Sequence, residues 1–330
     1  MTDDALDASI AQWLIRVRPG GEPVSIERAR EQTRELNALA LRQIDSRLTP
    51  ASETDQLISS PAGTIPIRVL RPAGQQPKPT VVYFHGGGWV LGDLDTHLGH
   101  ARRICVQADV VVISVGYRLA PEHRFPAAFD DAVFAAEWVA QRLAEFGGTD
   151  TLILAGDSVG GQLAASVAIA RRDAGQPLAA QLLLYPVTDV AGRYQDPEIN
   201  ALYMSRASSH QRFGLTLEGM IAFVHHYVDA PDAADWRVSP IRATDLGGVA
   251  PAVVHTSTLD VLRTEGNFYA DRLRAAGVRV IAREHPSLNH SYFGLGGVSA
   301  VADAAAAQAA DDLRELLREQ SDRHPLCRPG

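Results

Sequence analysis

Six short apolar runs constrain the fold of this chain more than any other feature of its sequence. They are rich in Val, Ile and Leu and comprise residues 80–85, 109–117, 151–156, 180–186, 251–257 and 278–285. Strands that are apolar on both alternating faces are typical of a parallel sheet covered by helices on both sides. The chain is therefore expected to form an open α/β sheet with right-handed crossovers.

The segments around these runs complete the expected secondary structure. Residues 55–60 and 64–72 predict an antiparallel pair of strands joined by the turn Pro61-Ala62-Gly63, which brings the sheet to eight strands. Helices are predicted where apolar residues recur three and four positions apart, over residues 6–17, 25–45, 127–147, 160–175, 264–277 and 301–320. The interval 187–250 is far longer than an ordinary connection, and such an insertion in an α/β sheet is usually functional, often a lid.

The composition limits the classes of function. The formal net charge of −8, from 31 Lys and Arg against 39 Asp and Glu, argues against a surface that binds nucleic acid. Two cysteines, Cys105 and Cys327, cannot build a disulfide framework or a multi-cysteine metal site. The first residues are acidic and lack the apolar core of a secretory signal, and no run of about 18 apolar residues occurs. We therefore expect a cytoplasmic protein without a membrane span.

One serine occupies a position that favours catalysis. Gly156-Asp157-Ser158-Val159-Gly160 matches G-x-S-x-G, with a predicted strand before it and a helix of small residues after it. A serine on such a sharp turn needs glycines around it so that neighbouring elements can approach. The pentapeptide alone leaves an ordinary turn between strand and helix equally open.

A glycine run strengthens the catalytic interpretation. Gly86, Gly87 and Gly88 follow the strand 80–85 directly, which is the arrangement that lipases and esterases use to aim backbone N–H groups at an oxyanion. The run lacks the Lys and the spacing of a phosphate-binding loop. A flexible turn would not explain why His85 precedes the run and Trp89 follows it.

A catalytic serine needs a base and an acid that orients the base, in the chain order Ser, Asp or Glu, His. Asp260 follows the strand 251–257, and His290 follows the strand 278–285. His285 is the alternative base, but it lies at the end of the strand before a proline, so His290 is favoured. His255 lies within a strand and is expected to be a packed core residue.

Together these residues resemble the hormone-sensitive lipase family of α/β-hydrolases, in particular its bacterial carboxylesterases of the GDSAGG type. The resemblance extends from about residue 60 to 295 and rests on four motifs in the family's order: HGGGW (85–89), YRLAPEHRFPAAFDD (117–131), GDSVGGQLA (156–164) and DVLRTEG (260–266). It implies an α/β-hydrolase fold with a mostly parallel eight-stranded sheet, helices on both faces and a helical cap.

The resemblance also assigns roles to single residues. It implies Ser158 as nucleophile, Asp260 as acid and His290 as base. It further implies an oxyanion hole that consists of the glycine run, in which Gly86 shapes the loop while Gly87, Gly88 and the amide of Val159 donate. His85, Asp157 and Glu265 are expected to support the site through hydrogen bonds.

The chain departs from the family at several of these positions. Val159 stands where the family usually has Ala, and residues 290–292 read His-Ser-Tyr where it usually has His-Gly-Phe. Residues 260–265 read Asp-Val-Leu-Arg-Thr-Glu in place of Asp-Pro-Leu-Arg-Asp-Glu. Because the amide of Val159, not its side chain, faces the oxyanion, activity is expected to survive these changes, whereas the pocket shape is expected to differ.

With the resemblance, the chain divides into five parts. Residues 1–50 are expected to form an N-terminal helical cap segment, 51–186 and 251–320 the hydrolase core, 187–250 a further part of the cap, and 321–330 a frayed tail.

The expected function is hydrolysis of short-chain acyl esters through an acyl-enzyme, without metal or organic cofactor. The expected partner is a small ester molecule and not nucleic acid. Two alternatives stay open: a lactonase or amidase with the same triad, and a non-catalytic small-molecule receptor on the same scaffold. A homodimer through the edge of the last strand is a further hypothesis.

Overall fold

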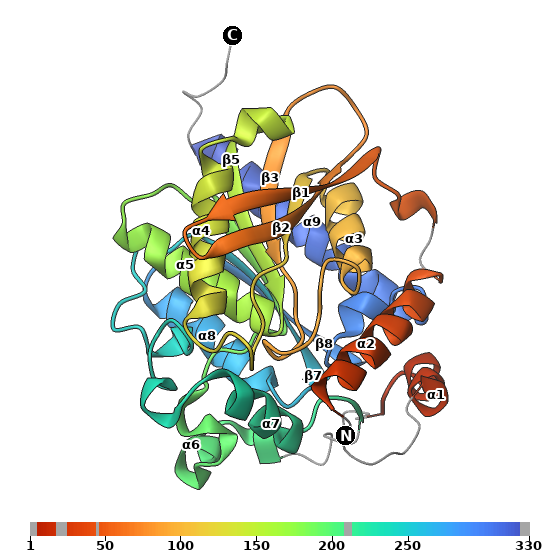
Figure 1. Ribbon diagram of the computed structural model, residues 1–330, viewed down its shortest axis with the longest axis vertical. Coiled ribbons are helices and arrows are strands. Elements are labelled where there is room, and N and C mark those ends of the chain that lie inside the picture. The colour runs from red at the N-terminus through yellow and green to blue at the C-terminus, as the bar shows by residue number, and fades with distance from the viewer. Residues whose placement is uncertain (1–4, 18–24, 44–45, 208–212, 324–330) are drawn as a thin grey trace.

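The computed structural model describes residues 5–17, 25–43, 46–207 and 213–323. Its strands form one sheet in the order β1-β2-β4-β3-β5-β6-β7-β8 (Figure 1). Strand β2 runs antiparallel to β1 and β4, and every other neighbouring pair is parallel. The strands are β1 (Ser52–Ser60), β2 (Gly63–Arg71), β3 (Lys78–Phe84), β4 (Val111–Val115), β5 (Gly148–Asp157), β6 (Ala180–Leu184), β7 (Ala252–Leu259) and β8 (Val280–Asn289). The predicted, mostly parallel eight-stranded α/β sheet is confirmed.

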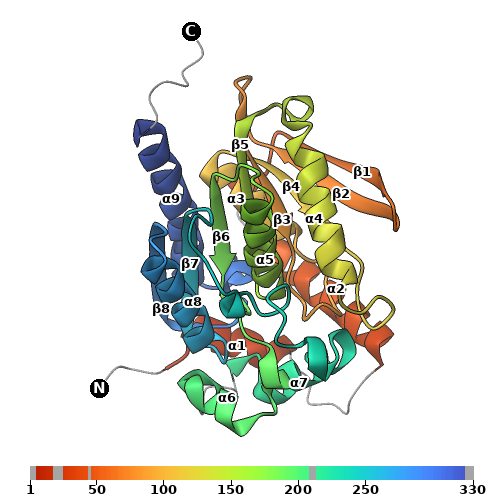
Figure 2. The same ribbon diagram turned by 90° about the vertical axis from the view of Figure 1, so that its left-hand side faces the viewer.

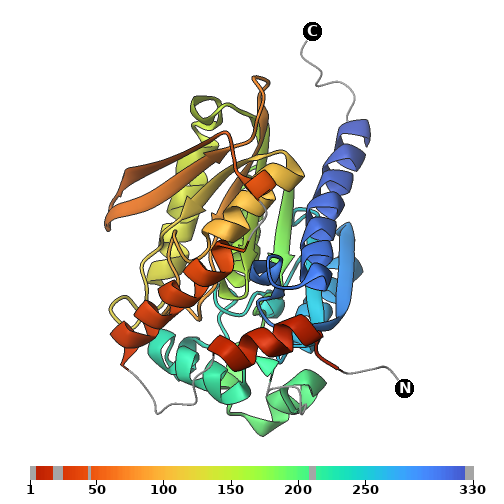
Figure 3. The same ribbon diagram turned by 90° about the vertical axis from the view of Figure 1, so that its right-hand side faces the viewer.

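Helices cover both faces of this sheet (Figures 2 and 3). One face packs against α4 (Ala127–Ala140), α5 (Val159–Asp173) and α8 (Arg263–Ala275). The other packs against α3 (Leu98–Ala108) and α9 (Ala300–Arg323), so that α9 continues three residues into the segment expected as a tail.

The central strands show why the apolar runs are unbroken. In β5, Leu152 and Leu154 belong to the hydrophobic core on the α4–α5–α8 face, whereas Ile153 and Ala155 belong to the core on the α3–α9 face. Successive side chains of a strand point to opposite faces, so a strand covered on both sides needs apolar residues at every position.

Helix α3 was not predicted from the sequence, and its composition explains why. Its core-facing side includes the buried polar residues His100 and Arg103 and the small residue Gly99. These residues interrupt the apolar spacing of three and four that marks a helix. The helix is therefore held by its tertiary surroundings more than by an apolar stripe of its own.

Four further helices lie across the carboxyl ends of the parallel strands (Figures 1 and 2). Two of them come from the N-terminal segment, and two come from the long interval between β6 and β7. They are α1 (Ala8–Val17), α2 (Ile26–Leu41), α6 (Pro197–Leu202) and α7 (Leu217–Tyr227). They cover the edge of the sheet at which β5, β7 and β8 end. None of the helices in the described ranges is long and apolar enough to span a membrane.

Candidate active site

Ser158 lies on a strained turn between β5 and α5. Its φ of 55° and ψ of −120° are unfavourable for a residue with a side chain. Glycines make the turn feasible: a Cβ on Gly156 would lie 2.2 Å from the backbone of Gly160, and a Cβ on Gly160 would lie 2.0 Å from the carbonyl oxygen of Phe84. The turn therefore places the Ser158 hydroxyl at the end of the sheet, on the wall of a cavity.

The structure brings Ser158, His290 and Asp260 together. The Nε2 of His290 lies 3.0 Å from the Oγ of Ser158, and its Nδ1 lies 2.7 Å from the Oδ2 of Asp260. Asp260 follows β7 directly and is 1% exposed, and its Oδ1 accepts the N–H of Leu262 at 2.9 Å. His290 follows β8 directly. Since β5, β7 and β8 end at the same edge of the sheet, three positions far apart in sequence meet there.

The alternative base, His285, belongs to a different network. Strand β8 continues through His285 to Asn289, so His285 does not lie in the loop. Its Nε2 lies 2.9 Å from the Nδ1 of His255, and the Nε2 of His255 lies 2.9 Å from the Oδ2 of Asp312. His255 is fully buried and hydrogen-bonded, as expected for a core histidine.

The glycine run forms a tight loop after β3. Gly87 and Gly88 have φ values of 117° and 64°, and a Cβ on Gly87 would lie 2.2 Å from the carbonyl oxygen of Leu91. The N–H of Gly86 donates to Asp157 at 2.8 Å, so this amide fixes the loop instead of facing the cavity. Within the described residues, no hydrogen bond occupies the amides of Gly87, Gly88 or Val159. These three amides are the ones that can receive an oxyanion.

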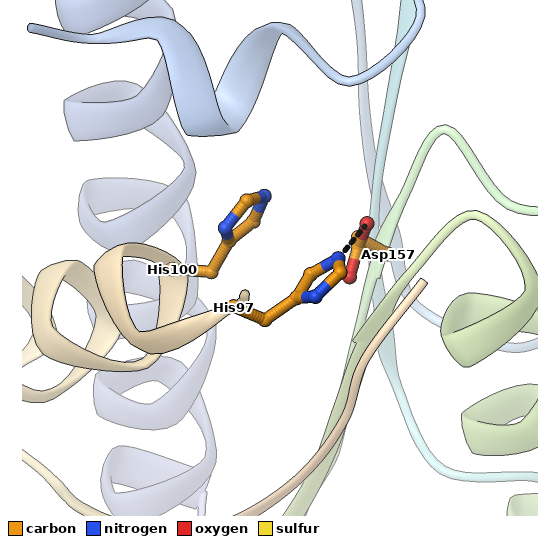
Figure 4. A group of neighbouring side chains, drawn as sticks. All are labelled: His97, His100 and Asp157. Atoms are coloured by element: carbon orange, nitrogen blue, oxygen red, sulfur yellow. Dashed lines mark ion pairs between the residues drawn. The ribbon is translucent and has the colours of Figure 1, made fainter. Parts of the chain in front are cut away.

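Asp157 anchors the glycine loop to the end of β5. Its Oδ1 accepts hydrogen bonds from the Gly86 amide and from the Tyr83 hydroxyl, the latter at 2.6 Å. Its Oδ2 lies 3.6 Å from the Nε2 of His97 (Figure 4). Burial alone would raise the pKa of Asp157, but His97, His100 and the Tyr83 hydroxyl outweigh it and hold this pKa well below its usual range. Asp157 is therefore a buried anion next to Ser158.

His85 orders the same loop from the other side. Its Nδ1 donates to the carbonyl oxygen of Gly86 at 2.8 Å, and its ring stacks on Tyr117 at a centroid distance of 4.3 Å. The Tyr117 hydroxyl donates to the carbonyl oxygen of His85 at 2.7 Å. Burial lowers the pKa of His85 to about 4, so its imidazole is neutral at pH 7.

Glu265 connects α8 to the long insertion between β6 and β7. Its Oε2 pairs with the Nη2 of Arg206 at 2.6 Å, and both side chains are fully buried. The Arg206 guanidinium also stacks on the rings of Tyr194 and Tyr203, at 4.2 and 4.3 Å. Glu265 further accepts the N–H of Thr188 at 2.8 Å. Burial raises the pKa of Glu265 despite this pairing. Arg206 was not predicted, because a single arginine in a long insertion offers no sequence pattern by which to find it.

A cavity of about 610 Å³ opens at Ser158 and His290. Its wall includes apolar side chains from α1, α2 and α7 that the sequence did not identify, among them Trp13, Leu36, Met220 and Phe223. The ring of Phe223 lies so close to Gly88 that a Cβ there would come within 2.3 Å of it. The site can thus enclose an apolar group next to a hydrogen-bonded serine and free amides.

Comparisons with known proteins agree with this geometry. A family profile described as alpha/beta hydrolase fold matches residues 81–294. The carboxylic ester hydrolase LipN of Mycobacterium tuberculosis is 42% identical over 259 residues, which cover 75% of this chain and 66% of LipN. The ethyl acetate hydrolase of Pseudomonas putida is 34% identical over 305 residues, which cover 88% of this chain and 90% of that enzyme.

A solved structure shows the same similarity. A hyperthermophilic esterase from the archaeon Pyrobaculum calidifontis superposes with a TM-score of 0.85 at 33% identity, covering 94% of this chain and 99% of that chain. The chain therefore belongs to the α/β-hydrolase family, which confirms its resemblance to the esterases of the hormone-sensitive lipase group.

Proposed function

We propose that this chain is a carboxylic ester hydrolase that works through an acyl-enzyme on Ser158. The observation that carries the proposal is the hydrogen-bonded series from Ser158 through His290 to Asp260, with distances of 3.0 and 2.7 Å, on the wall of a cavity. The relatives named as ester hydrolases support the same activity.

In the first half of the reaction, the Ser158 oxygen attacks the ester carbonyl carbon while its proton moves to the Nε2 of His290. Asp260 accepts the Nδ1–H of His290, which sets the tautomer and stabilises the imidazolium. The carbonyl oxygen becomes an oxyanion that accepts hydrogen bonds from the amides of Gly87, Gly88 and Val159. Each such bond stabilises the transition state by about 3 kcal/mol. The proton then passes from His290 to the leaving alcohol as the bond between carbon and alkoxy oxygen breaks.

In the second half, water replaces the alcohol. His290 takes a proton from the water as the water oxygen attacks the acyl carbon, and it returns that proton to Ser158 as the acid leaves. The serine and the histidine end the cycle as they began it, so this sequence requires no further reactant.

We propose that the helices α1, α2 and α7 enclose the substrate, so that residues 1–50 and 187–250 act as a cap. Trp13 of α1 and Phe223 of α7 line the same cavity as Ser158. The cavity volume of about 610 Å³ lies within the ordinary range for small-molecule sites of about 300–1,000 Å³, and we expect a preference for short acyl chains. A series of p-nitrophenyl esters with acyl chains from acetate upward tests this, and the largest kcat/KM is expected among the short chains.

The test of the mechanism is covalent labelling. A fluorophosphonate should label the wild-type protein once per chain and should not label Ser158→Ala, which should also lose hydrolysis of p-nitrophenyl butyrate. A non-catalytic receptor would react with neither reagent. Retained turnover or labelling in folded Ser158→Ala would refute the assignment.

Two further predictions concern the protein in solution. Strand β8 is the last in the sheet, so its outer edge has no partner strand among the described residues, and we propose that a second copy pairs there. Size-exclusion chromatography with light scattering distinguishes a dimer from a monomer. The cytoplasmic location stays a prediction that cell fractionation would test.

A further inference from the structure

Two histidines and an aspartate gather beside the catalytic triad without belonging to it. His97 precedes α3, His100 lies in the first turn of α3, and Asp157 ends β5 (Figure 4). Each offers one ligand atom, these atoms lie within 4.8 Å of one another, and all three residues are buried. His97 caps the N-terminus of α3 and His100 lies in its first turn, so the start of this helix brings both imidazoles near the same carboxylate.

The hydrogen bonds of His97 leave its Nε2 facing a carboxylate. The Thr96 hydroxyl donates to the carbonyl oxygen of Asp93 at 3.0 Å, and it lies 2.9 Å from the Nδ1 of His97. In the tautomer of His97 that carries its hydrogen on Nδ1, the ring donates to this hydroxyl, whose single hydrogen goes to the carbonyl oxygen of Asp93. In the neutral ring, the lone pair of Nε2 then faces the Oδ2 of Asp157 at 3.6 Å. Metal-binding histidines have this arrangement, with one nitrogen donating to an outer oxygen and the other free for the metal.

His100 supplies a second nitrogen. Its side chain is 4% exposed, and its Nε2 has no hydrogen-bond partner. A buried polar atom without a partner destabilises the folded state, so its presence calls for an explanation. Gly294 leaves the ring its space, because a Cβ at that position would lie 2.7 Å from the Cε1 of His100.

We propose that His97, His100 and Asp157 bind one divalent transition-metal ion of the zinc class. Two imidazole nitrogens and one carboxylate oxygen form a ligand set that zinc accepts, with the fourth position open to water. Bonds of 2.0–2.1 Å in a tetrahedron separate two ligand atoms by about 3.4 Å, close to the 3.6 Å between His97 and Asp157. The ligand atom of His100 lies within 4.8 Å of the other two, so binding requires His100 to move closer to them.

The surroundings of the cluster allow such an ion to enter, and they connect it to the glycine loop. His97, His100 and Asp157 all line the cavity that opens at Ser158, which provides a path from solvent. The Oδ2 of Asp157 would hold the ion while its Oδ1 keeps the amide of Gly86. The ion would thus join α3 to the loop that carries the amides of Gly87 and Gly88.

The test is direct metal binding by the full chain, measured in Ser158→Ala so that it does not depend on ester hydrolysis. After removal of metals with a chelator, titration with Zn²⁺ in a calorimeter should show one site per chain. Titration with Co²⁺ should give the visible absorption of a four-coordinate cobalt site. Adding His100→Ala should weaken binding by at least about tenfold and abolish the absorption, whereas adding His225→Ala, which removes an exposed histidine of α7, should change neither.

Several outcomes would overturn the proposal. One is the absence of stoichiometric binding, in which case the contact of His97 with Asp157 serves the fold alone. Another is binding that survives in folded His100→Ala but disappears in His225→Ala or Cys327→Ser, which would place the metal elsewhere on the chain. If His100→Ala does not fold, His100→Asn serves instead, and unchanged cobalt absorption in that variant would equally refute the site.

Discussion

Two hydrogen-bonded pairs of histidine and aspartate occur in this protein, and their surroundings differ. His290 and Asp260 are 2.7 Å apart, and His255 and Asp312 are 2.9 Å apart. The second nitrogen of His290 faces the Ser158 hydroxyl on the cavity wall. The second nitrogen of His255 faces another histidine, His285, and the ring is fully buried.

The comparison shows that the pair itself does not make an active site. Burial lowers the pKa of His255, although its hydrogen bond to Asp312 acts in the opposite direction, so this ring is a structural link between β7 and α9. His290 differs because it faces Ser158 on a strained turn, next to free amides and a cavity. Five predictions test which of these side chains serve catalysis and which serve stability, from the largest expected effect to the smallest.

Removing the base should have the largest effect. His290→Ala is expected to lower kcat for p-nitrophenyl butyrate by about 10⁴-fold or more, because Ser158 then has no group to take its proton. His285→Ala is the matched control and should stay within a few-fold of wild type. A larger loss for His285→Ala than for His290→Ala would reverse the assignment of the base.

Changing the acid should come next. Asp260→Asn keeps the shape of the residue but removes the charge that stabilises the imidazolium and sets its tautomer, so kcat should fall by about 10⁴-fold with little change in KM. Asp312→Asn changes the other pair in the same way and should leave kcat within a few-fold. Equal losses in both variants would show that the two pairs are not functionally distinct.

The buried ion pair between Arg206 and Glu265 should contribute to the stability of the fold. Glu265→Gln removes the carboxylate charge that pairs with the buried Arg206 guanidinium, and the free energy of unfolding should fall by about 3 kcal/mol in urea denaturation. Asp271→Asn removes an exposed ion pair with Arg274 and should cost less than about 0.5 kcal/mol. A similar small loss in both variants would mean that burial does not decide how much an ion pair contributes to the free energy of unfolding.

The second histidine pair should also affect stability, but less. Asp312 accepts from His255 at 2.9 Å and from Arg283 at 2.9 Å, so Asp312→Asn should lower the free energy of unfolding by about 2 kcal/mol. Thermal denaturation with circular dichroism measures it. A drop in kcat larger than the drop in folded fraction would instead connect this pair to catalysis.

The smallest effect concerns pH. Burial, with the neighbouring His255, lowers the pKa of His285 to about 4, below the value of 6.5 that it has when unfolded. As the pH falls, His285 is therefore protonated in the unfolded chain before it is protonated in the folded one. This difference destabilises the folded state progressively from about pH 6.5 to 4, and it is absent above pH 7.

Urea denaturation of wild type and His285→Gln isolates this term. Between pH 6.5 and 5 the wild type should lose at most about 1 kcal/mol more stability than the variant, since solvent screens the partly exposed ring. An identical pH dependence in both would show that His285 does not titrate with a lowered pKa.

Much of the fold was predictable because its causes are local. Strands buried on both faces must be apolar at consecutive positions, and the turn at Ser158 requires Gly156 and Gly160, so both features can be recognised in short stretches of sequence. Helix α3 could not be predicted in this way, because it buries His100 and Arg103 among core residues.

The sequence by itself determined the type of sheet, the position of Ser158 and the order in which an acid and a base must follow it. Only the tertiary structure decided that β8 extends to Asn289 and carries His290 to a serine 132 positions earlier, while His285 joins another network. The same holds for the pairing of Arg206 with Glu265 and for Phe223 on the cavity wall. The physical reason is that these contacts depend on which strand ends and helices lie side by side in the folded chain. The local periodicity of a sequence carries no information on such long-range contacts.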